Sequence, residues 1–353
     1  MTGELQRRQQ RNRNVILVLC FMVLIFAAIC IFVGSSHMTL TECIDALLQK
    51  GTDVNNRIIW NIRIPRVLAA VIAGAGLSVA GLIMQTTLNN PMASPSTLGV
   101  SNAAVFGANL SIIVFAGGFL TTGGNAANYM AGANPYMTSL MAFVFSTLSI
   151  LLILGLCTFR AFSPNVVVLA GIAIGSVWTA MTTILQFYAT DVGLSAAVVW
   201  SFGDLGRATY RTDWMMLAVV VIAIIYFMLM AWKLNGLLSG EATAKTMGIN
   251  VEALRFTSML LASVITAVCV SFLGIIGFVG IICPHVVKKL LGQDHRVTVP
   301  ASALGGSLLL LLADTLSRSM GDGSALPVGA ITSLLGAPFF VAIIFSRKEN
   351  RGC

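Results

Sequence analysis

Two arginines have a spacing that could serve recognition of an acidic partner. Arg63 and Arg66 flank Ile64 and Pro65, and residues three apart lie on the same face of a helix. Pro65 could open that helix at its first turn, because proline is tolerated where the backbone N–H is unsatisfied anyway. The alternative is that both side chains simply extend to a membrane–water interface. The spacing alone leaves both interpretations open.

A second polar segment, residues 88–101, contains amides, hydroxyls and two prolines but no charged residue. It could be a tight turn in which Ser96 or Thr97 caps the following helix. It could also be a kinked polar constriction that closes a transport pathway without an ion site. The sequence does not decide between a turn and a gate.

A third segment, residues 233–255, carries several helix-capping signals. Ser239 could cap a short helix that ends at Gly248 in a left-handed turn, and Asn250 could cap a second helix. Glu252 would then lie at the positive end of that second helix. A plain connecting loop is the alternative, but capped helices favour a compact surface that docks a soluble partner.

Several kinds of catalytic site are absent from the sequence. No Gly-Lys pair occurs, so the chain cannot bind ATP through a P-loop. No Ser-His-Asp, paired-carboxylate or HExxH arrangement lies in or near an apolar block, and the seven cysteines form no CxxC. We therefore expect no enzymatic activity, no metal site and no cofactor bound by this chain.

The elements that must position these residues are membrane helices. No Asp, Glu, Lys or Arg occurs between Arg66 and Arg160, and only 10% of all residues are charged, against about 25% in globular proteins. A helix needs about 20 apolar residues to cross a bilayer. The apolar blocks predict an all-α polytopic membrane protein with ten spans, roughly at 15–34, 66–86, 98–118, 137–159, 165–188, 214–232, 256–275, 277–292, 299–317 and 327–346.

Orientation follows from the positive charges. Lys and Arg are more frequent in the loops on the side of the two termini, which places both termini in the cytoplasm. The 233–255 loop is then cytoplasmic, and Arg63 and Arg66 lie at the outer rim. The net charge of +8 is explained by cytoplasmic loops and does not call for a nucleic-acid partner. Glycines one turn apart, Gly74 to Gly81 and Gly171 to Gly175, predict close helix packing.

These motifs resemble the permease subunits of iron-siderophore, haem and cobalamin ABC importers, which are FecCD-type, type II importers. The first half carries Arg63-Ile-Pro-Arg66, Asn90-Pro91-Met-Ala93 and Leu98-Gly-Val-Ser101. The second half carries Gly277 to His285, Asp294-His-Arg296, Leu312-Ala-Asp314 with Arg318, Leu326-Pro-Val-Gly329 and Gly336-Ala-Pro338. The resemblance covers essentially the whole chain after the first span. It is specific for the family and not for the substrate.

The resemblance implies a single transmembrane permease domain over residues 1–353, folded like the cobalamin importer permease, in the cytoplasmic (inner) membrane. It implies a second permease subunit, either another copy or a paralogue, and an ATP-binding cassette ATPase dimer that holds ATP and Mg²⁺. An extracytoplasmic substrate-binding protein would deliver the metal chelate, and membrane lipid would surround the spans.

Site residues also carry over by position. The residues that would dock the binding protein are Arg63, Arg66 and Arg318. The gate and pathway residues would be Asn90, Pro91, Met92, Ser163 and Pro164. The residues that would couple to the ATPase are Gly240, Glu241, Ala242, Lys245, Met247 and Gly248. Two features depart from the family pattern, namely Met92 in place of a commoner leucine and a long loop between Gly117 and Pro135 that is rich in Gly and Asn.

The expected function is import of a bulky metal chelate, with a ferric siderophore ahead of haem and cobalamin, driven by ATP hydrolysis in the partner subunits. An ion-coupled secondary transporter is the alternative, and it would need a carboxylate or histidine in mid-span. Only Asp314 and His285 fall in the expected spans, and Asp314 lies near a span end. A polytopic membrane enzyme is a further alternative, for which no catalytic cluster is visible.

Overall fold

The computed structural model describes residues 2–34, 38–117, 134–158, 164–320 and 325–349. Within them the chain is helical and contains no β-strand, which confirms the predicted all-α class. Seven helices in the described ranges are long and apolar enough to cross a membrane, and three shorter apolar helices cover Val100–Phe115, Asp191–Ser201 and Val328–Phe339. The count of ten spans and the cytoplasmic position of both termini stay predictions.

The helices group into two compact units. Unit 1 comprises residues 1–82, 205–235 and 277–353. Its helices are α1 (Thr2–Phe32), α2 (Leu40–Leu47), α3 (Asp53–Arg57), most of α4 (Ile64–Thr87), α10 (Tyr210–Leu229), the start of α11 (Ala231–Leu238), α14 (Val279–Leu291), α15 (His295–Met320) and α16 (Val328–Glu349).

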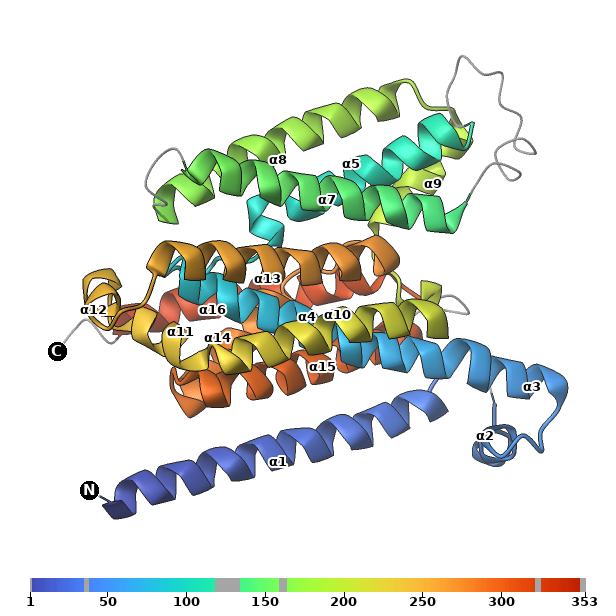
Figure 1. Cartoon of the computed structure of the whole chain (residues 1–353). Helices are drawn as coiled ribbons and strands as arrows, with labels where there is room; N and C mark the ends of the chain where they lie inside the picture. The colour runs from blue at the N-terminus through green and yellow to red at the C-terminus, as the bar shows by residue number, and fades with distance from the viewer. Residues whose placement is uncertain (1, 35–37, 118–133, 159–163, 321–324, 350–353) are drawn as a thin grey trace. The chain divides into compact units, whose positions relative to one another are not determined.

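Unit 2 comprises residues 83–204 and 236–276, and so includes the last turn of α4 and the end of α11. Its other helices are α5 (Val100–Asn109), α7 (Pro135–Thr158), α8 (Pro164–Phe187), α9 (Asp191–Ser201), α12 (Glu241–Thr246) and α13 (Val251–Leu273). Helices α5, α7 and α8 pack against one another, and α13 packs against α5 and α7 (Figure 1). Helix α9 was not expected from the sequence.

The helix that carries Arg63 begins earlier than Pro65, which corrects the sequence-based expectation. It begins at Asp53, where the Thr52 hydroxyl accepts a hydrogen bond from the Asn55 N–H at 3.3 Å. A π-helical turn over Ile58–Arg63 then leads into α4. In this turn the N–H of Ile64 donates to the carbonyl of Ile59, five residues earlier. The backbone hydrogen bonds have therefore already shifted from the α-helical to the π-helical pattern just before Pro65, which has no N–H to donate.

Glycines allow the close helix contacts that the sequence predicts. A Cβ on Gly81 of α4 would overlap the carbonyl oxygen of Gly280 in α14, and one on Gly74 would overlap the backbone of Gly306 in α15. In unit 2, a Cβ on Gly99 would lie 2.8 Å from the Cα of Gly175. Backbones thus approach at distances that only glycine permits, as is common between membrane helices.

Candidate functional site

The Asn90 turn follows the last residue of α4, Thr87, in unit 2. Asn89 adopts a left-handed backbone with φ of 45°, and the N–H of Asn90 returns to the carbonyl of Gln85 at 3.1 Å. The Asn90 side chain accepts a hydrogen bond from the Met92 N–H at 2.9 Å. These local bonds present Pro91 and Met92 at the surface, with Met92 44% exposed.

The hydroxyls in this segment close the turn instead of capping the next helix. The Ser94 N–H donates to the Thr97 hydroxyl at 3.0 Å, and the Thr97 N–H donates to the Ser94 hydroxyl at 3.2 Å. Helix α5 starts after Gly99, which has φ of 80° and supplies no side-chain cap. Neither Ser96 nor Thr97 therefore caps α5, which the turn interpretation had allowed. A left-handed glycine provides the chain reversal instead.

A groove of about 520 Å³, lined by both polar and apolar residues, lies between this turn and α8. Its polar side chains, all uncharged, are Ser96, Thr97, Asn102, Ser176, Thr179 and Thr183. Asn102 fixes the wall by donating to the Gly175 carbonyl at 3.3 Å and to the Thr179 hydroxyl at 3.2 Å. Sequence reasoning missed the α8 part of this groove. The sequence feature that could have indicated it is that Ser176, Thr179 and Thr183 follow one another at intervals of three and four residues within an apolar span.

The other expected gate residues lie at the start of α8. Pro164 is the first residue of that helix, a position where proline is favoured. Ser163 lies outside the described residues, as does most of the Gly- and Asn-rich loop, residues 118–133. The gate role of Asn90, Pro91, Met92, Ser163 and Pro164 stays a prediction.

The short helix α12 exposes the residues that the resemblance assigns to ATPase coupling. Those residues, all exposed, are Gly240, Glu241, Ala242, Lys245, Met247 and Gly248. Two of the expected boundaries are confirmed. Gly248 has φ of 77°, and the Asn250 side chain accepts from the Ala253 N–H at 3.0 Å. Their coupling role stays a prediction.

Two details of that segment differ from expectation. Gly240, and not Ser239, occupies the N-cap of α12, and it offers no side-chain acceptor. The second helix, which Asn250 caps, is the long α13 and not a short helix confined to residues 233–255. Packing explains the second difference, because one face of α13 is buried along most of its length and the helix therefore continues as a span.

Glu241 connects α12 to the interior of unit 2. Its carboxylate lies 3.0 Å from Lys245 Nζ and 2.9 Å from Arg255 Nη1. The hydrogen bonds from Lys245 and Arg255 hold the pKa of Glu241 below its ordinary value, which keeps the carboxylate charged. Arg255 also donates from Nε to the Thr87 carbonyl at 3.2 Å. The sequence had not singled out Arg255.

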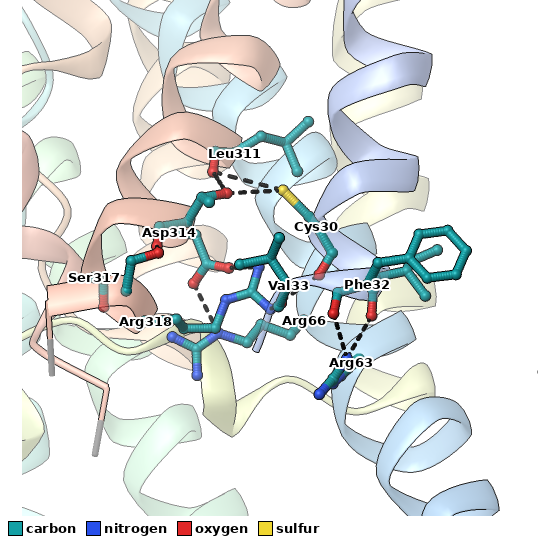
Figure 2. Close-up of polar contacts among 12 residues, drawn as sticks. Cys30, Phe32, Val33, Arg63, Arg66, Leu311, Asp314, Ser317 and Arg318 are labelled. Carbon is teal, nitrogen blue, oxygen red and sulfur yellow. Dashed lines mark hydrogen bonds and ion pairs between the residues drawn. The ribbon is translucent and has the colours of Figure 1, made fainter. Parts of the chain in front are cut away.

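The three arginines expected to dock a binding protein meet in unit 1, where they are buried (Figure 2). Arg66 Nε lies 2.7 Å from Asp314 Oδ1, and Arg318 Nη2 lies 2.9 Å from Asp314 Oδ2. Asp314 is fully buried. Its charge is thus shared by two guanidinium groups, as a buried carboxylate requires.

The end of α1 supplies the other acceptors in this arginine cluster. Arg63 donates to the carbonyls of Ile31 and Phe32 at 2.8 and 3.0 Å (Figure 2). Arg318 donates to the carbonyls of Cys30 and Val33 at 3.0 and 2.6 Å. Carbonyls at a helix C-terminus lack intrahelical partners and carry partial negative charge, so two cations stabilise this end of α1.

The docking role of Arg63, Arg66 and Arg318 stays a prediction, and the structure adds a constraint to it. Each guanidinium already contacts acceptors of its own chain, and each residue is at most 8% exposed. Spacing could have indicated one of these contacts, because Asp314 and Arg318 are four residues apart on one helix. No local sequence pattern could have indicated the contact of Arg66 with Asp314, because the two residues are 248 positions apart.

Carboxylates inside helices bear on the ion-coupled alternative. Asp314 lies within α15, and Arg66 and Arg318 neutralise it. The expected spans had left Asp213 outside, yet it lies in the first turn of α10 and is 3% exposed. Neither of its oxygens has a hydrogen-bond partner in the described part of the chain. Among the described residues, no three His, Cys, Asp or Glu side chains come together as metal ligands.

Comparison with known proteins decides the family. Residues 19–346 match the family model of the FecCD transport family. This chain belongs to the FecCD transport family. A relative from Methanocaldococcus jannaschii, named as an ABC transporter permease protein, is 45% identical over 337 residues, which cover 95% of this chain and 94% of the relative.

Other relatives and a solved structure agree with that assignment. The hemin transport system permease protein of Yersinia pestis is 33% identical, with 99% of each chain covered. The vitamin B12 import system permease protein of Escherichia coli is 31% identical and covers 97% of this chain and 98% of its own. A metal-chelate type ABC transporter in an inward-facing conformation superposes with a TM-score of 0.79 at 25% identity, covering 95% of this chain and 99% of that one.

These findings confirm the family inferred from the motifs. The FecCD chain is an ABC transporter permease with the fold of the vitamin B12 import permease, and it is a multi-pass protein of the inner membrane. The family consists of transport subunits, so the expectation of a non-catalytic chain agrees with it.

Proposed function

We propose that this FecCD permease imports a bulky metal chelate, with a ferric siderophore as the first candidate and haem or cobalamin as the others. ATP hydrolysis in a partner ATPase dimer drives the import, and an extracytoplasmic binding protein delivers the cargo. A second permease subunit, either another copy or a paralogue, completes the pathway. ATP and Mg²⁺ reside in the ATPase, and this chain binds no cofactor.

The groove beside the Asn90 turn is the observation that carries this proposal. All of its polar side chains are uncharged amides and hydroxyls. Such a wall can form hydrogen bonds with the polar rim of a large chelate, yet it offers no carboxylate, thiolate or imidazole that would compete for the metal. Relatives named for hemin and for vitamin B12 transport support the same class of cargo.

Reconstitution tests the proposal. The permease is assembled with its ATPase in liposomes, the binding protein is added outside, and uptake of labelled ferric siderophore, hemin and cobalamin is measured. We expect uptake of at least one chelate that requires internal ATP and is insensitive to a protonophore. Uptake that survives ATP depletion and collapses with the protonophore would instead establish the ion-coupled alternative.

Cargo selection is tested separately on the binding protein. Titration of the cognate binding protein with the same three chelates should identify one tight ligand, and that ligand should be the one transported. A binding protein that holds a free metal ion and none of the chelates would contradict the proposed substrate class.

A further inference from the structure

Arg255 joins the segment predicted to couple to the ATPase to the segment predicted to form the gate, although the two are far apart in the sequence. It lies in the second turn of α13 and is 7% exposed. Its Nη1 donates to Glu241 of α12 at 2.9 Å, and its Nε donates to the carbonyl of Thr87 at 3.2 Å. A single planar guanidinium therefore contacts the exposed helix α12 and the end of α4 at the same time, which its fixed fork of donors makes possible.

The Thr87 carbonyl lies at the C-terminus of α4, directly before the Asn90 turn. Thr87 is the last residue of α4, and carbonyls at a helix C-terminus have no partner within the helix. Two residues later the chain reverses at Asn89, and Asn90 then closes the turn through the Met92 N–H. A cation at this carbonyl is favoured by the helix dipole and fixes the backbone from which the Asn90 turn projects.

The other end of the connection reaches the surface. The side chain of Glu241 is 43% exposed, and that of its second partner, Lys245, is 56% exposed. Met247, at the end of the same helix, is 54% exposed. Charge-assisted hydrogen bonds thus run from the exposed face of α12 through Glu241 and Arg255 to the Thr87 carbonyl, and such bonds are roughly twice as strong as neutral ones.

We propose that Arg255 is a positioning residue that transmits displacement of α12 to the turn at Asn90–Met92. When α12 moves relative to α13, the guanidinium can keep its contacts with both Glu241 and Thr87 only if the end of α4 moves as well. The end of α4 and the Asn90 turn then change position together with α12. This inference rests on the proposed function, because an ATPase partner must be what moves α12.

The test follows position 92 as a reporter of the turn, since the Met92 side chain is exposed. A Met92→Cys permease, with the exposed Cys20 and the C-terminal Cys353 both changed to serine, is assembled with its ATPase in nanodiscs. The rate at which a polar maleimide labels the introduced thiol is measured with and without ATP and vanadate, alongside ATPase rate and thermal stability. Arg255→Met, Arg255→Lys and Glu241→Gln are compared with Arg296→Met, which changes an exposed arginine on α15.

We expect nucleotide to change the labelling rate of the introduced thiol at least fivefold in the parent and in Arg296→Met. Arg255→Met should abolish that change and lower uptake at least tenfold, while the ATPase rate stays within about twofold. Arg255→Lys should retain part of the response, since an ammonium can reach one acceptor but cannot reproduce the fork. Glu241→Gln should weaken the response while keeping the shape of the side chain.

Retention of the full labelling response in both Arg255→Met and Glu241→Gln would overturn the proposal, even if both variants were less stable. Loss of assembly in Arg255→Met with a normal response in Glu241→Gln would also overturn it, because Arg255 would then only tie α12 to α13 for folding. Absence of any nucleotide response or uptake in the parent complex would contradict the proposed function itself and this inference with it.

Discussion

Arg66 donates its Nε proton to Asp314, a residue 248 positions further along the chain, at 2.7 Å. Arg318 approaches the second carboxylate oxygen of the same aspartate from one helical turn away. The contact therefore ties α4 to α15 within unit 1, and through Arg318 it also reaches the end of α1.

Removing the charge of Asp314 should destabilise the protein strongly. Asp314→Asn leaves two buried guanidinium groups without a counter-charge, and breaking a buried ion pair costs about 3–5 kcal/mol. Asp213→Asn is the matched control, because that buried aspartate has no hydrogen-bond partner in the described part of the chain. Thermal unfolding in detergent should show a much lower unfolding temperature for Asp314→Asn and an unchanged one for Asp213→Asn. Equal losses would contradict the role of the ion pair.

The docking prediction can now be tested against the burial of the arginines. If Arg63 and Arg66 receive acidic residues of the binding protein, the double change to glutamine should weaken docking at least tenfold while assembly with the ATPase persists. Arg57→Gln, an exposed cation on the preceding helix α3, is the control. Surface plasmon resonance on nanodiscs would measure the affinities. Loss of docking in Arg57→Gln alone would assign recognition to exposed cations instead.

The exposed face of α12 should couple ATP hydrolysis to transport. Combined substitution of Glu241 and Met247 by alanine removes the internal tie and an exposed apolar contact, so we expect ATP hydrolysis to continue while uptake falls at least tenfold. Uptake per ATP hydrolysed in proteoliposomes is the measurement. Normal transport by the double variant would show that residues 233–255 are only a connector.

The ion pairs of Glu241 should respond to acid. Because the pKa of Glu241 is lowered in the folded protein, its stabilisation is present above the ordinary carboxyl pKa of about 4.3 and is lost as the pH falls through the lower folded-state value. Hydrogen exchange of residues 241–248 should therefore accelerate below about pH 4, beyond the change in intrinsic rate. The Glu241→Gln variant should show that faster opening already at neutral pH. A variant without any difference at neutral pH would contradict the assignment.

Helix packing in unit 1 should be sensitive to a single methyl group. Gly81→Ala places a Cβ against the Gly280 carbonyl and should cost about 1–3 kcal/mol, the usual penalty for overpacking. Gly155→Ala in α7 meets no atom within 4 Å and should instead stabilise its helix by up to about 1 kcal/mol. The unfolding temperatures of the Gly81→Ala and Gly155→Ala variants would be measured and compared. A tolerated Gly81→Ala would disprove the close approach.

Much of the candidate site was predictable from the sequence, because its signals are local. The charge-free run after Arg66 predicts membrane helices, Gly248 and Asn250 mark helix boundaries, and the motif order identifies the family. Local rules failed where the alternatives are nearly equal in energy. Ser239 and Gly240 are adjacent candidates for one helix cap, and Pro65 follows a π-helical turn that no periodicity indicates.

The sequence by itself determined the class, the positions of the long helices and the family, since hydrophobic length and motif spacing act over a few dozen residues at most. Only the tertiary structure decided which charges are satisfied inside the protein. Asp314 with Arg66, and Arg255 with Thr87 168 positions away, meet because packing brings distant helices together. Burial makes a charge without a partner costly, and no spacing rule reports which distant residue supplies the partner.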